Sequence, residues 1–273
     1  MKVIKQKRKI PYWGLAILLL AIFSLSVMYM NGQGEAILTN AGAASNEKIG
    51  WGIKRNDNHE QPDLGKKNQT LLQQNGGIAM GNKDKKYIYL TFDEGYEAGY
   101  TPQILEALKQ NQVKATFFIT AHYVNTQPDL VKQMIDQGHI VGNHTVNHKS
   151  MPELTKEQIQ TEVMDLHQVI KEKYQYEMKY IRPPKGEYSE RTLQETQAMG
   201  YKTVMWSFAY QDWDEKKQPD MVAAKKKILD NLHPGEIMLL HGNSKTNTNL
   251  LGEIIQEAKK MGYEFKSLDE FEQ

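Results

Sequence analysis

Short apolar runs alternate with amphipathic segments along the last two thirds of the chain. β-rich runs occur at 87–92, 113–120, 139–143, 179–182, 202–208, 236–241 and 263–267. Helical periodicity lies between them, at Pro102–Lys109, Pro128–Gln137, Lys156–Lys173, Ser189–Met199, Pro219–Leu232 and Asn247–Met261. This alternation predicts an α/β fold whose parallel strands are joined by crossover helices. Seven such units indicate a barrel one unit short of the usual eight, with an open doubly wound sheet as the alternative.

Polar side chains gather where these apolar runs end. The residues concerned are Asp93 and Glu94, His144 and His148, Arg182, Asp212 and His241. All of them lie at the carboxyl end of an expected strand. In a barrel those ends converge on one face, where active sites are built. In an open sheet the outer strands would hold some of these residues too far apart to share one site. Their placement therefore favours the barrel and predicts one shared site.

The segment Ile10–Met30 has no charged residue and is mostly apolar. A helix of this length spans about 30 Å, the thickness of one hydrocarbon core. Five basic residues precede it and should stay in the cytoplasm, so that the chain after Met30 lies outside. The alternative is a cleaved signal peptide, because Ala41-Gly-Ala43 resembles a cleavage site, although it lies far from the apolar segment. Either reading places the rest of the chain outside the cytoplasmic membrane.

The chain divides into four regions by composition. Residues 1–32 form a basic tail and a membrane anchor or signal, and residues 33–48 form a small, polar linker. Residues 49–86, with a weak helical stretch near Leu64–Gln74, are expected to form an arm packed on the main domain, 87–273. The hydrophobic share of 40% and the charged share of 25% are ordinary for a globular protein.

Charge and cysteine content argue against several classes of function and site. Net charge is +1, but five of the 34 basic residues precede the first acidic residue, which leaves 29 against 33 acidic ones. This slightly acidic remainder argues against nucleic-acid binding. The absence of cysteine excludes disulfides, thiolate zinc sites and a cysteine nucleophile.

The spacing His144-x3-His148 predicts a metal site. On a helical turn, residues four apart have Cβ atoms about 5–6 Å apart, so that both imidazoles reach one zinc-like ion. Adjacent residues after a strand point in different directions, so one of Asp93 and Glu94 can ligate while the other acts as a base. Such a divalent ion, most simply Zn²⁺, lowers the pKa of water towards about 7. Together these residues indicate a hydrolytic metal centre.

The remaining polar residues suit the supporting roles of such chemistry. His241 is a candidate general acid for a leaving amine, and Asp212 can raise its pKa by charge proximity. Arg182 can orient a carboxylate, and the loop after it, Pro183–Gly186, offers backbone N–H groups for an oxyanion. Aromatic faces suit sugar rings, although packing is their default role; they belong to Trp206, Tyr210 and Trp213. Five histidines fit no cluster and are expected to be structural or on the surface: His59, His122, His139, His167 and His233.

Five ordered motifs resemble those of the polysaccharide deacetylase family, the NodB-homology group or carbohydrate esterase family 4. They are Thr-Phe-Asp-Glu (91–94), His-Thr-Val-Asn-His (144–148), Arg-Pro-Pro-Lys-Gly (182–186), Asp-Trp (212–213) and Leu-Leu-His (239–241). The resemblance covers about residues 87–268. It implies a distorted (β/α)7 barrel and metal-dependent N-deacetylation of amino sugars.

The resemblance also implies a role for each matching residue. Asp93 matches the catalytic base and His241 the general acid. His144 and His148 match metal ligands. Arg182 corresponds to the arginine that orients the base, and Asp212 to the residue that tunes the acid. Lys185 lies where the family uses a backbone N–H for the oxyanion.

Glu94 departs from the family pattern, in which the second carboxylate is Asp. Glu is one methylene longer and can still ligate through oxygen. The subgroup that makes muramic δ-lactam in spore cortex is similar in lacking that Asp, and the stretches 51–54, 95–102 and 206–213 also resemble it. We therefore expect a peptidoglycan N-acetylmuramic acid deacetylase that faces the cell wall and acts after an amidase. The alternatives are a deacetylase of N-acetylglucosamine in peptidoglycan or chitin-like oligomers, and an inactive wall-binding module.

Overall fold

The protein is described by a computed structural model covering residues 44–273, of which 45–273 form one compact unit. The predicted membrane segment, 10–30, lies outside these residues. Among residues 44–273, no helix is long and apolar enough to cross a membrane.

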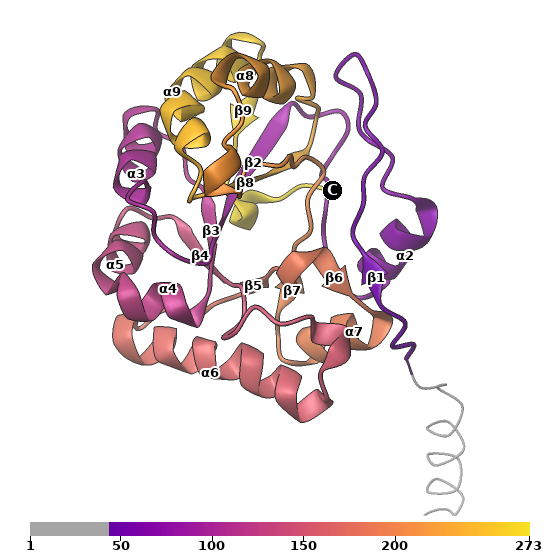
Figure 1. Cartoon of the computed structure of the whole chain (residues 1–273). Helices are drawn as coiled ribbons and strands as arrows, with labels where there is room; N and C mark the ends of the chain where they lie inside the picture. Colours follow the sequence, from indigo (N-terminus) through magenta and orange to yellow (C-terminus); the bar gives the residue numbers. More distant parts are fainter. Residues whose placement is uncertain (1–43) are drawn as a thin grey trace, which may run out of the picture. The chain divides into compact units, whose positions relative to one another are not determined.

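A curled parallel sheet lies at the centre of the domain (Figure 1). Its strands are β2 (Tyr87–Glu94), β3 (Thr116–Ile119), β4 (Ile140–Asn143), β5 (Tyr180–Ile181), β7 (Lys202–Thr203), β8 (Glu236–His241) and β9 (Glu264–Phe265). The order is β7-β5-β4-β3-β2-β8, and each neighbouring pair is parallel. The seven predicted strands and the α/β class are therefore confirmed.

The sheet departs from the predicted barrel at its last strand. β9 pairs with Tyr87 and Ile88 at the start of β2, while β8 pairs with β2 from Ile88 to Asp93. Since β8 occupies one edge of β2, β9 shares the other edge with β3 and does not stand between β7 and β8. Isolated bridges such as Phe208 with Met238 span that gap instead. The described strands thus form a curled half-barrel rather than a ring of seven paired strands.

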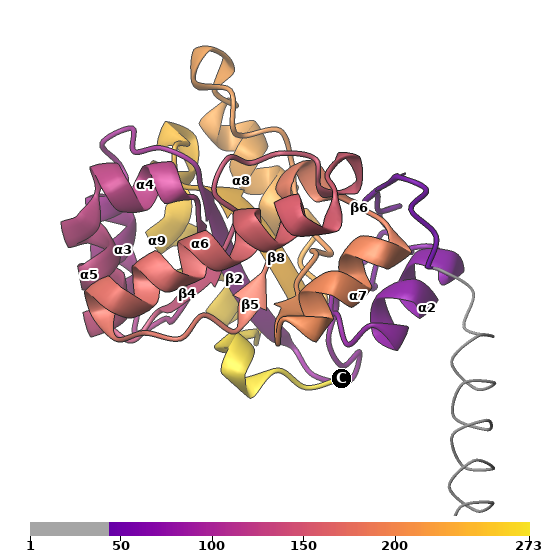
Figure 2. The same ribbon diagram turned by 90° about the horizontal axis from the view of Figure 1, so that it is seen from below.

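Helices cover the outside of the curled sheet (Figure 2). They are α3 (Thr101–Gln110), α4 (Ala121–Thr126), α5 (Pro128–Asp136), α6 (Lys156–Tyr174), α7 (Glu190–Ala198), α8 (Met221–Asp230) and α9 (Lys245–Lys260). The six predicted helices are confirmed to within a few residues at each end, and α4 was not predicted. In α6 the buried residues recur at three- and four-residue spacing, and a capping box begins the helix; they are Ile159, Val163, Leu166 and Ile170.

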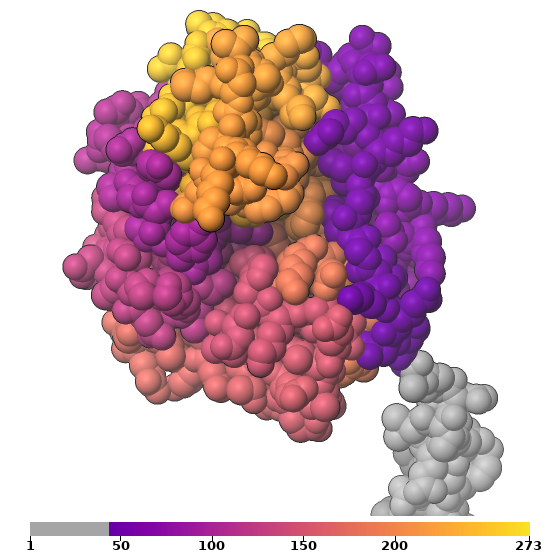
Figure 3. Space-filling view, in the orientation of Figure 1, coloured from indigo at the N-terminus to yellow at the C-terminus, as the bar shows by residue number. Residues whose placement is uncertain are grey.

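Residues 49–86 run along one side of the domain, where Figure 3 shows them in indigo. β1 (Ile49–Gly50) pairs antiparallel with β6 (Glu187–Tyr188), and α2 (Lys66–Gln74) buries Leu72. Leu72 packs in a small core with Tyr188 and Met205 from the main domain. The last residues of the predicted linker are also attached, because the backbone N–H of Ser45 donates to Glu190 on α7 at 3.0 Å.

Candidate active site

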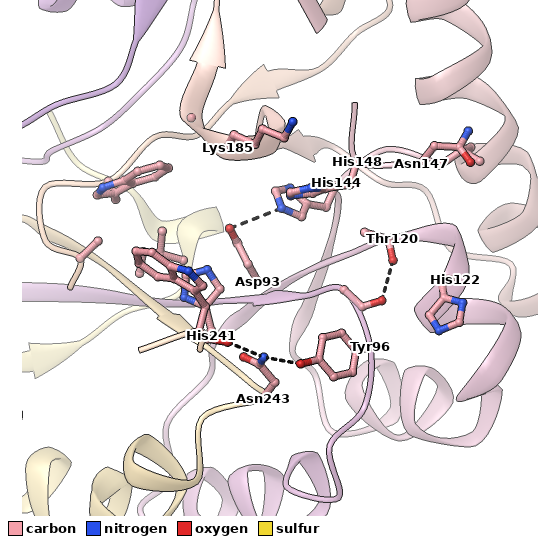
Figure 4. A pocket seen from close by; sticks show the side chains of 17 residues that line it. Asp93, Tyr96, Thr120, His122, His144, Asn147, His148, Lys185, His241 and Asn243 are labelled. Carbon is pink, nitrogen blue, oxygen red and sulfur yellow. Dashed lines mark hydrogen bonds and ion pairs between the residues drawn. The ribbon is translucent and has the colours of Figure 1, made fainter. Parts of the chain in front are cut away.

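A cavity of about 1000 Å³ opens at the carboxyl ends of the central strands. Figure 4 shows its principal side chains, which come from the carboxyl ends of β2 and β8 and from the segments that follow β2, β3, β4, β5, β7 and β8. The predicted site residues that line it are Asp93, His144, His148, Lys185, Trp213 and His241, and Trp206 lines it as well. The structure thus brings these side chains together at one face of the sheet.

Asp93, the last residue but one of β2, is held by a buried arginine. Arg182 Nη1 donates to Asp93 Oδ1 at 2.8 Å, and its Nε donates to the Val204 carbonyl at 3.2 Å. The guanidinium also lies 4.2 Å from the centre of the Phe118 ring, a favourable cation–π position. Burial alone would raise the pKa of Asp93, but the charges of Arg182 and the nearby histidines hold that pKa below its ordinary value. Asp93 is therefore an oriented, ionised carboxylate facing the cavity.

His144 and His148 lie in the loop after β4. Their ring centres are 4.8 Å apart, and His144 Nε2 is 3.5 Å from Asp93 Oδ2. The loop is not the helical turn that the sequence predicted, because Thr145 and His148 have φ values of 68° and 54°. Glu162 on α6 fixes this irregular backbone by accepting hydrogen bonds from Asn147 N and Nδ2 at 2.7 and 2.8 Å.

The chemistry of the histidine pair fits a divalent cation. His144 Nδ1–H donates to the Arg182 carbonyl at 2.9 Å, which leaves the lone pair of Nε2 facing the cavity. Burial lowers the pKa of His144 and lowers that of His148 to about 4, so both rings are neutral at pH 7. Within residues 44–273, no group of three or more His, Cys, Asp or Glu side chains is arranged as a metal site. Because both imidazoles are neutral and face one cavity, they fit as two members of a ligand set.

His241 ends β8 on the other side of Asp93. Its Nδ1–H donates to Asp212 Oδ1 at 2.7 Å, and its backbone N–H donates to Asp212 Oδ2 at 2.9 Å. Burial would lower the pKa of His241, but the hydrogen bond and charge of Asp212 outweigh it and raise that pKa above the ordinary value. Trp213, 51% exposed, has its ring centre 5.6 Å from the His241 ring. Asp212 therefore favours the protonated form of His241, whose ring faces the cavity.

Glu94 does not join the metal ligands, contrary to the prediction. It is fully buried on the other face of β2, and Thr101 Oγ1 donates to its Oε1 at 3.5 Å. Its carboxyl fills the space beside Gly242, where an added Cβ would lie 1.9 Å from Oε1. Burial raises the pKa of Glu94 well above its ordinary value, and nearby carboxylates raise it further. A buried carboxyl that is turned away from the histidines, and whose charged form is disfavoured by burial, is a poor cation ligand.

Tyr210, which the sequence predicted to bind substrate, lies beneath the cavity wall and does not line the cavity. It is 7% exposed, and its hydroxyl donates to Asn247 Oδ1. Asn247 Nδ2 in turn donates to Asp212 Oδ2. Tyr210 therefore supports the Asp212–His241 pair and does not touch a substrate in the cavity.

The loop that carries Lys185 is held by the N-terminal arm. Trp51 N donates to the Gly186 carbonyl at 2.8 Å, and Trp51 Nε1 donates to the Trp206 carbonyl at 2.9 Å. Lys185 and Gly186 have φ values of 60° and 66°. A Cβ on Gly186 would lie 2.7 Å from the Trp206 ring, so glycine is required there.

Sequence reasoning missed several residues of the cavity wall. Among them are Tyr96, His122 and Asn243. Asn243 Nδ2 donates to the Tyr96 hydroxyl and to the Trp213 carbonyl, each at 3.0 Å, and so joins three loops. The exposed aromatic residue Tyr96, directly after the Asp-Glu-Gly motif, was the available signal. The other four unassigned histidines do not line the cavity.

Replacing Glu94 tests its placement. Because Glu94→Gln is close to isosteric and Glu94 does not line the cavity, we expect kcat/KM to stay within about threefold of the wild type. Steady-state acetate release and metal content per chain measure this. Loss of both in a variant with an unchanged unfolding temperature would contradict the placement of Glu94 outside the metal centre.

Comparison with known proteins finds relatives that are polysaccharide deacetylases. The polysaccharide deacetylase family model matches residues 80–204. The chain is 44% identical over 241 residues to the peptidoglycan-N-acetylmuramic acid deacetylase PdaA of Bacillus subtilis, with 86% of this chain and 92% of that protein covered. It is 35% identical over 190 residues to a peptidoglycan-N-acetylglucosamine deacetylase of Bacillus cereus, covering 68% of this chain and 88% of that protein.

A solved structure of Bacillus subtilis PdaA, described as a family 4 carbohydrate esterase, superposes with a TM-score of 0.81. The two are 43% identical, and the match covers 83% of this chain and 97% of that one. The curled α/β sheet described above is thus the fold of that esterase. The chain belongs to the polysaccharide deacetylase family.

Proposed function

We propose that this protein is a metal-dependent peptidoglycan N-acetylmuramic acid deacetylase. The observation that carries the proposal is one cavity in which an ionised carboxylate, Asp93, stands between a neutral histidine pair and the Asp212–His241 pair. Hydrolysis of an acetamide needs a base for water and an acid for the departing amine, and the cavity offers one of each.

In the proposed reaction, Asp93 takes a proton from a water molecule as the water oxygen bonds to the acetamide carbon. Arg182 keeps Asp93 ionised and aimed into the cavity. We propose that the backbone N–H of Lys185, which lines the cavity, donates to the developing oxyanion. His241 then gives its proton to the nitrogen as the C–N bond breaks, which releases acetate and a free amine on the sugar.

His144 and His148 would hold the divalent ion, for which we propose zinc. When bound, such an ion supplies Lewis-acid polarisation of the carbonyl and acidifies water. The identity of the ion is tested by metal analysis of the purified chain and by restoring activity to chelator-treated protein with individual divalent salts.

The substrate proposal rests on the relatives, whose names point to two sugars. N-acetylmuramic acid is favoured by the higher identity and coverage of the Bacillus subtilis protein, and N-acetylglucosamine by the Bacillus cereus protein. We further propose that removal of the stem peptide by an amidase precedes the reaction, and that the freed amine closes on the lactyl carboxyl to give the δ-lactam of spore cortex.

Acetate release from peptidoglycan with and without its stem peptides tests this substrate. Full-length protein is incubated with intact and with amidase-treated peptidoglycan. We expect release from the treated glycan alone. Equal release from both, or release from chitooligosaccharides alone, would favour the N-acetylglucosamine alternative.

For location, we propose that residues 10–30 anchor the protein in the cytoplasmic membrane, or are removed on export, with the domain facing the wall. Support comes from the uncharged apolar segment and the basic cluster before it. Protease accessibility of the domain in intact protoplasts, followed by the size of the membrane-bound product, tests both versions.

The pH profile should reflect the two opposite pKa shifts. Activity needs Asp93 ionised, and its pKa is lowered from 3.8, so kcat/KM should be lost only below that pH. It also needs His241 protonated, and that pKa is raised from 6.5, so the alkaline limb should lie above 6.5.

The variant Asp212→Asn removes the charge that raises the His241 pKa. Its alkaline limb should therefore move to lower pH, while the acid limb stays in place. Asp212 accepts from His241 Nδ1 at Oδ1 and from His241 N and Asn247 Nδ2 at Oδ2. Asn has a single acceptor oxygen and cannot accept at both positions, so a loss of stability of about 1–3 kcal/mol is expected as well. An unmoved alkaline limb would contradict the assignment of His241 as the titrating acid.

A further inference from the structure

Lys185 is the one lysine or arginine among the described residues that line the active-site cavity. It is exposed, whereas the prolines before it and the glycine after it are buried. Figure 4 shows its side chain on the same side of the cavity as His144 and His148, across from Tyr96 and Asn243. The oxyanion role assigned to this position uses only its backbone, so the ammonium group is left unexplained.

The acidic groups nearby are already engaged. Asp93 is paired with Arg182 at 2.8 Å, and Glu162 binds the backbone and side chain of Asn147. On the outer side, Glu153 lies 2.8 Å from Lys48. In the part of the chain that the structure describes, these pairings leave Lys185 without a carboxylate of its own. An unpaired cation in a ligand cavity indicates a ligand that carries the opposite charge.

The backbone from which this side chain extends is held in place. Pro183 and Pro184 restrict the chain before Lys185, whose φ of 60° is in the left-handed region. The chain after Lys185 is restrained as well, because the backbone N–H of Trp51 donates to the Gly186 carbonyl at 2.8 Å. A loop fixed on both sides presents the lysine at a defined position, which favours recognition of a particular substrate group.

Muramic acid differs from glucosamine by a lactyl group on O3, next to the carbon that bears the acetamide. That group ends in a carboxylate when the stem peptide has been removed, and in an uncharged amide when it has not. We propose that the Lys185 ammonium binds the free lactyl carboxylate and so selects N-acetylmuramic acid whose peptide has been removed. This rests on the proposed function and explains the reaction order: an amide-cleaving reaction must first create the charge that Lys185 recognises.

The test compares two forms of one peptide-free glycan oligomer, one with free lactyl carboxylates and one with them capped as methylamides. The full-length chain is compared with three variants, each of which carries one substitution. Lys185→Gln removes the charge and keeps the backbone N–H, and Lys185→Arg keeps the charge. Lys149→Gln is the matched control, because Lys149 is an exposed loop lysine that lies 3.7 Å from Glu162 and does not line the cavity.

We expect wild-type protein to prefer the free carboxylate by about tenfold or more in kcat/KM, the size of a hydrogen bond between charged groups. Lys185→Gln should abolish this preference chiefly through KM, and Lys185→Arg should keep most of it. Lys149→Gln should behave as wild type. The preference should also shrink as ionic strength rises.

Two results would overturn the proposal in distinguishable ways. If Lys185→Gln keeps the wild-type preference, or lowers kcat/KM equally for both forms, the side chain does not read the carboxylate, while the proposed function stands. If wild-type protein deacetylates glucosamine oligomers and neither muramoyl form, the proposed function fails and the Lys185 proposal fails with it.

Discussion

Asp93→Asn is expected to lower kcat for acetate release by about 10²–10⁴-fold, the usual contribution of a positioned general base. The amide oxygen of Asn can still accept from Arg182 Nη1, but Asn cannot take a proton from water. Steady-state and single-turnover acetate release measure the loss, with the unfolding temperature recorded for the same preparation.

Glu94→Gln is the matched control for this variant. It makes the same change of acid to amide at the next residue of the same strand, on the face of β2 turned away from the cavity. If both variants lose activity equally, the loss comes from the structure of β2 and not from the chemistry of Asp93. If Asp93→Asn retains full activity, the assignment of the base is wrong.

His241→Asn is expected to lower kcat for amide substrates by about 10²–10⁴-fold, because an amine leaves poorly unless it is protonated. An aryl acetate such as p-nitrophenyl acetate has a leaving group that departs as a stable anion. The variant should therefore lose far less activity on the aryl ester than on the glycan.

The ratio of the two activities separates an acid from a structural residue. His241 is hydrogen-bonded to Asp212 at 2.7 Å, so its replacement also disturbs the support of the site. Disturbed support lowers hydrolysis of both substrates. An equal loss on the ester and on the glycan would thus contradict the role of His241 as proton donor to the amine.

The strands and helices could be predicted because each carries its own periodicity. The position of β9 could not, because it depends on two residues that pair with the beginning of β2. Nor could the sequence show that Trp51 supports the Lys185 loop, since the contact joins segments more than 130 residues apart. Contacts of this kind are set by tertiary packing, which local patterns do not encode.

The sequence could predict those residues of the site that lie at the carboxyl ends of strands. Asp93, Arg182 and His241 meet there because parallel strands present their carboxyl ends at one face. Glu94 and Tyr210 were misplaced for one shared reason. Residue type does not tell which side of a strand or loop faces the cavity, and both side chains turn into the protein interior. Asn247, which links Tyr210 to Asp212, was hidden for the same reason.

The most direct test of the account is to locate the free amine on the product glycan. Peptide-free glycan strands are incubated with the full-length chain and with Asp93→Asn, and their fragments are sequenced by tandem mass spectrometry. We expect muramic acid residues to lose their acetyl groups, with or without lactam closure, and glucosamine residues to keep theirs, whereas Asp93→Asn should leave both intact. Unchanged muramic acid residues after treatment with active wild-type protein would contradict the account.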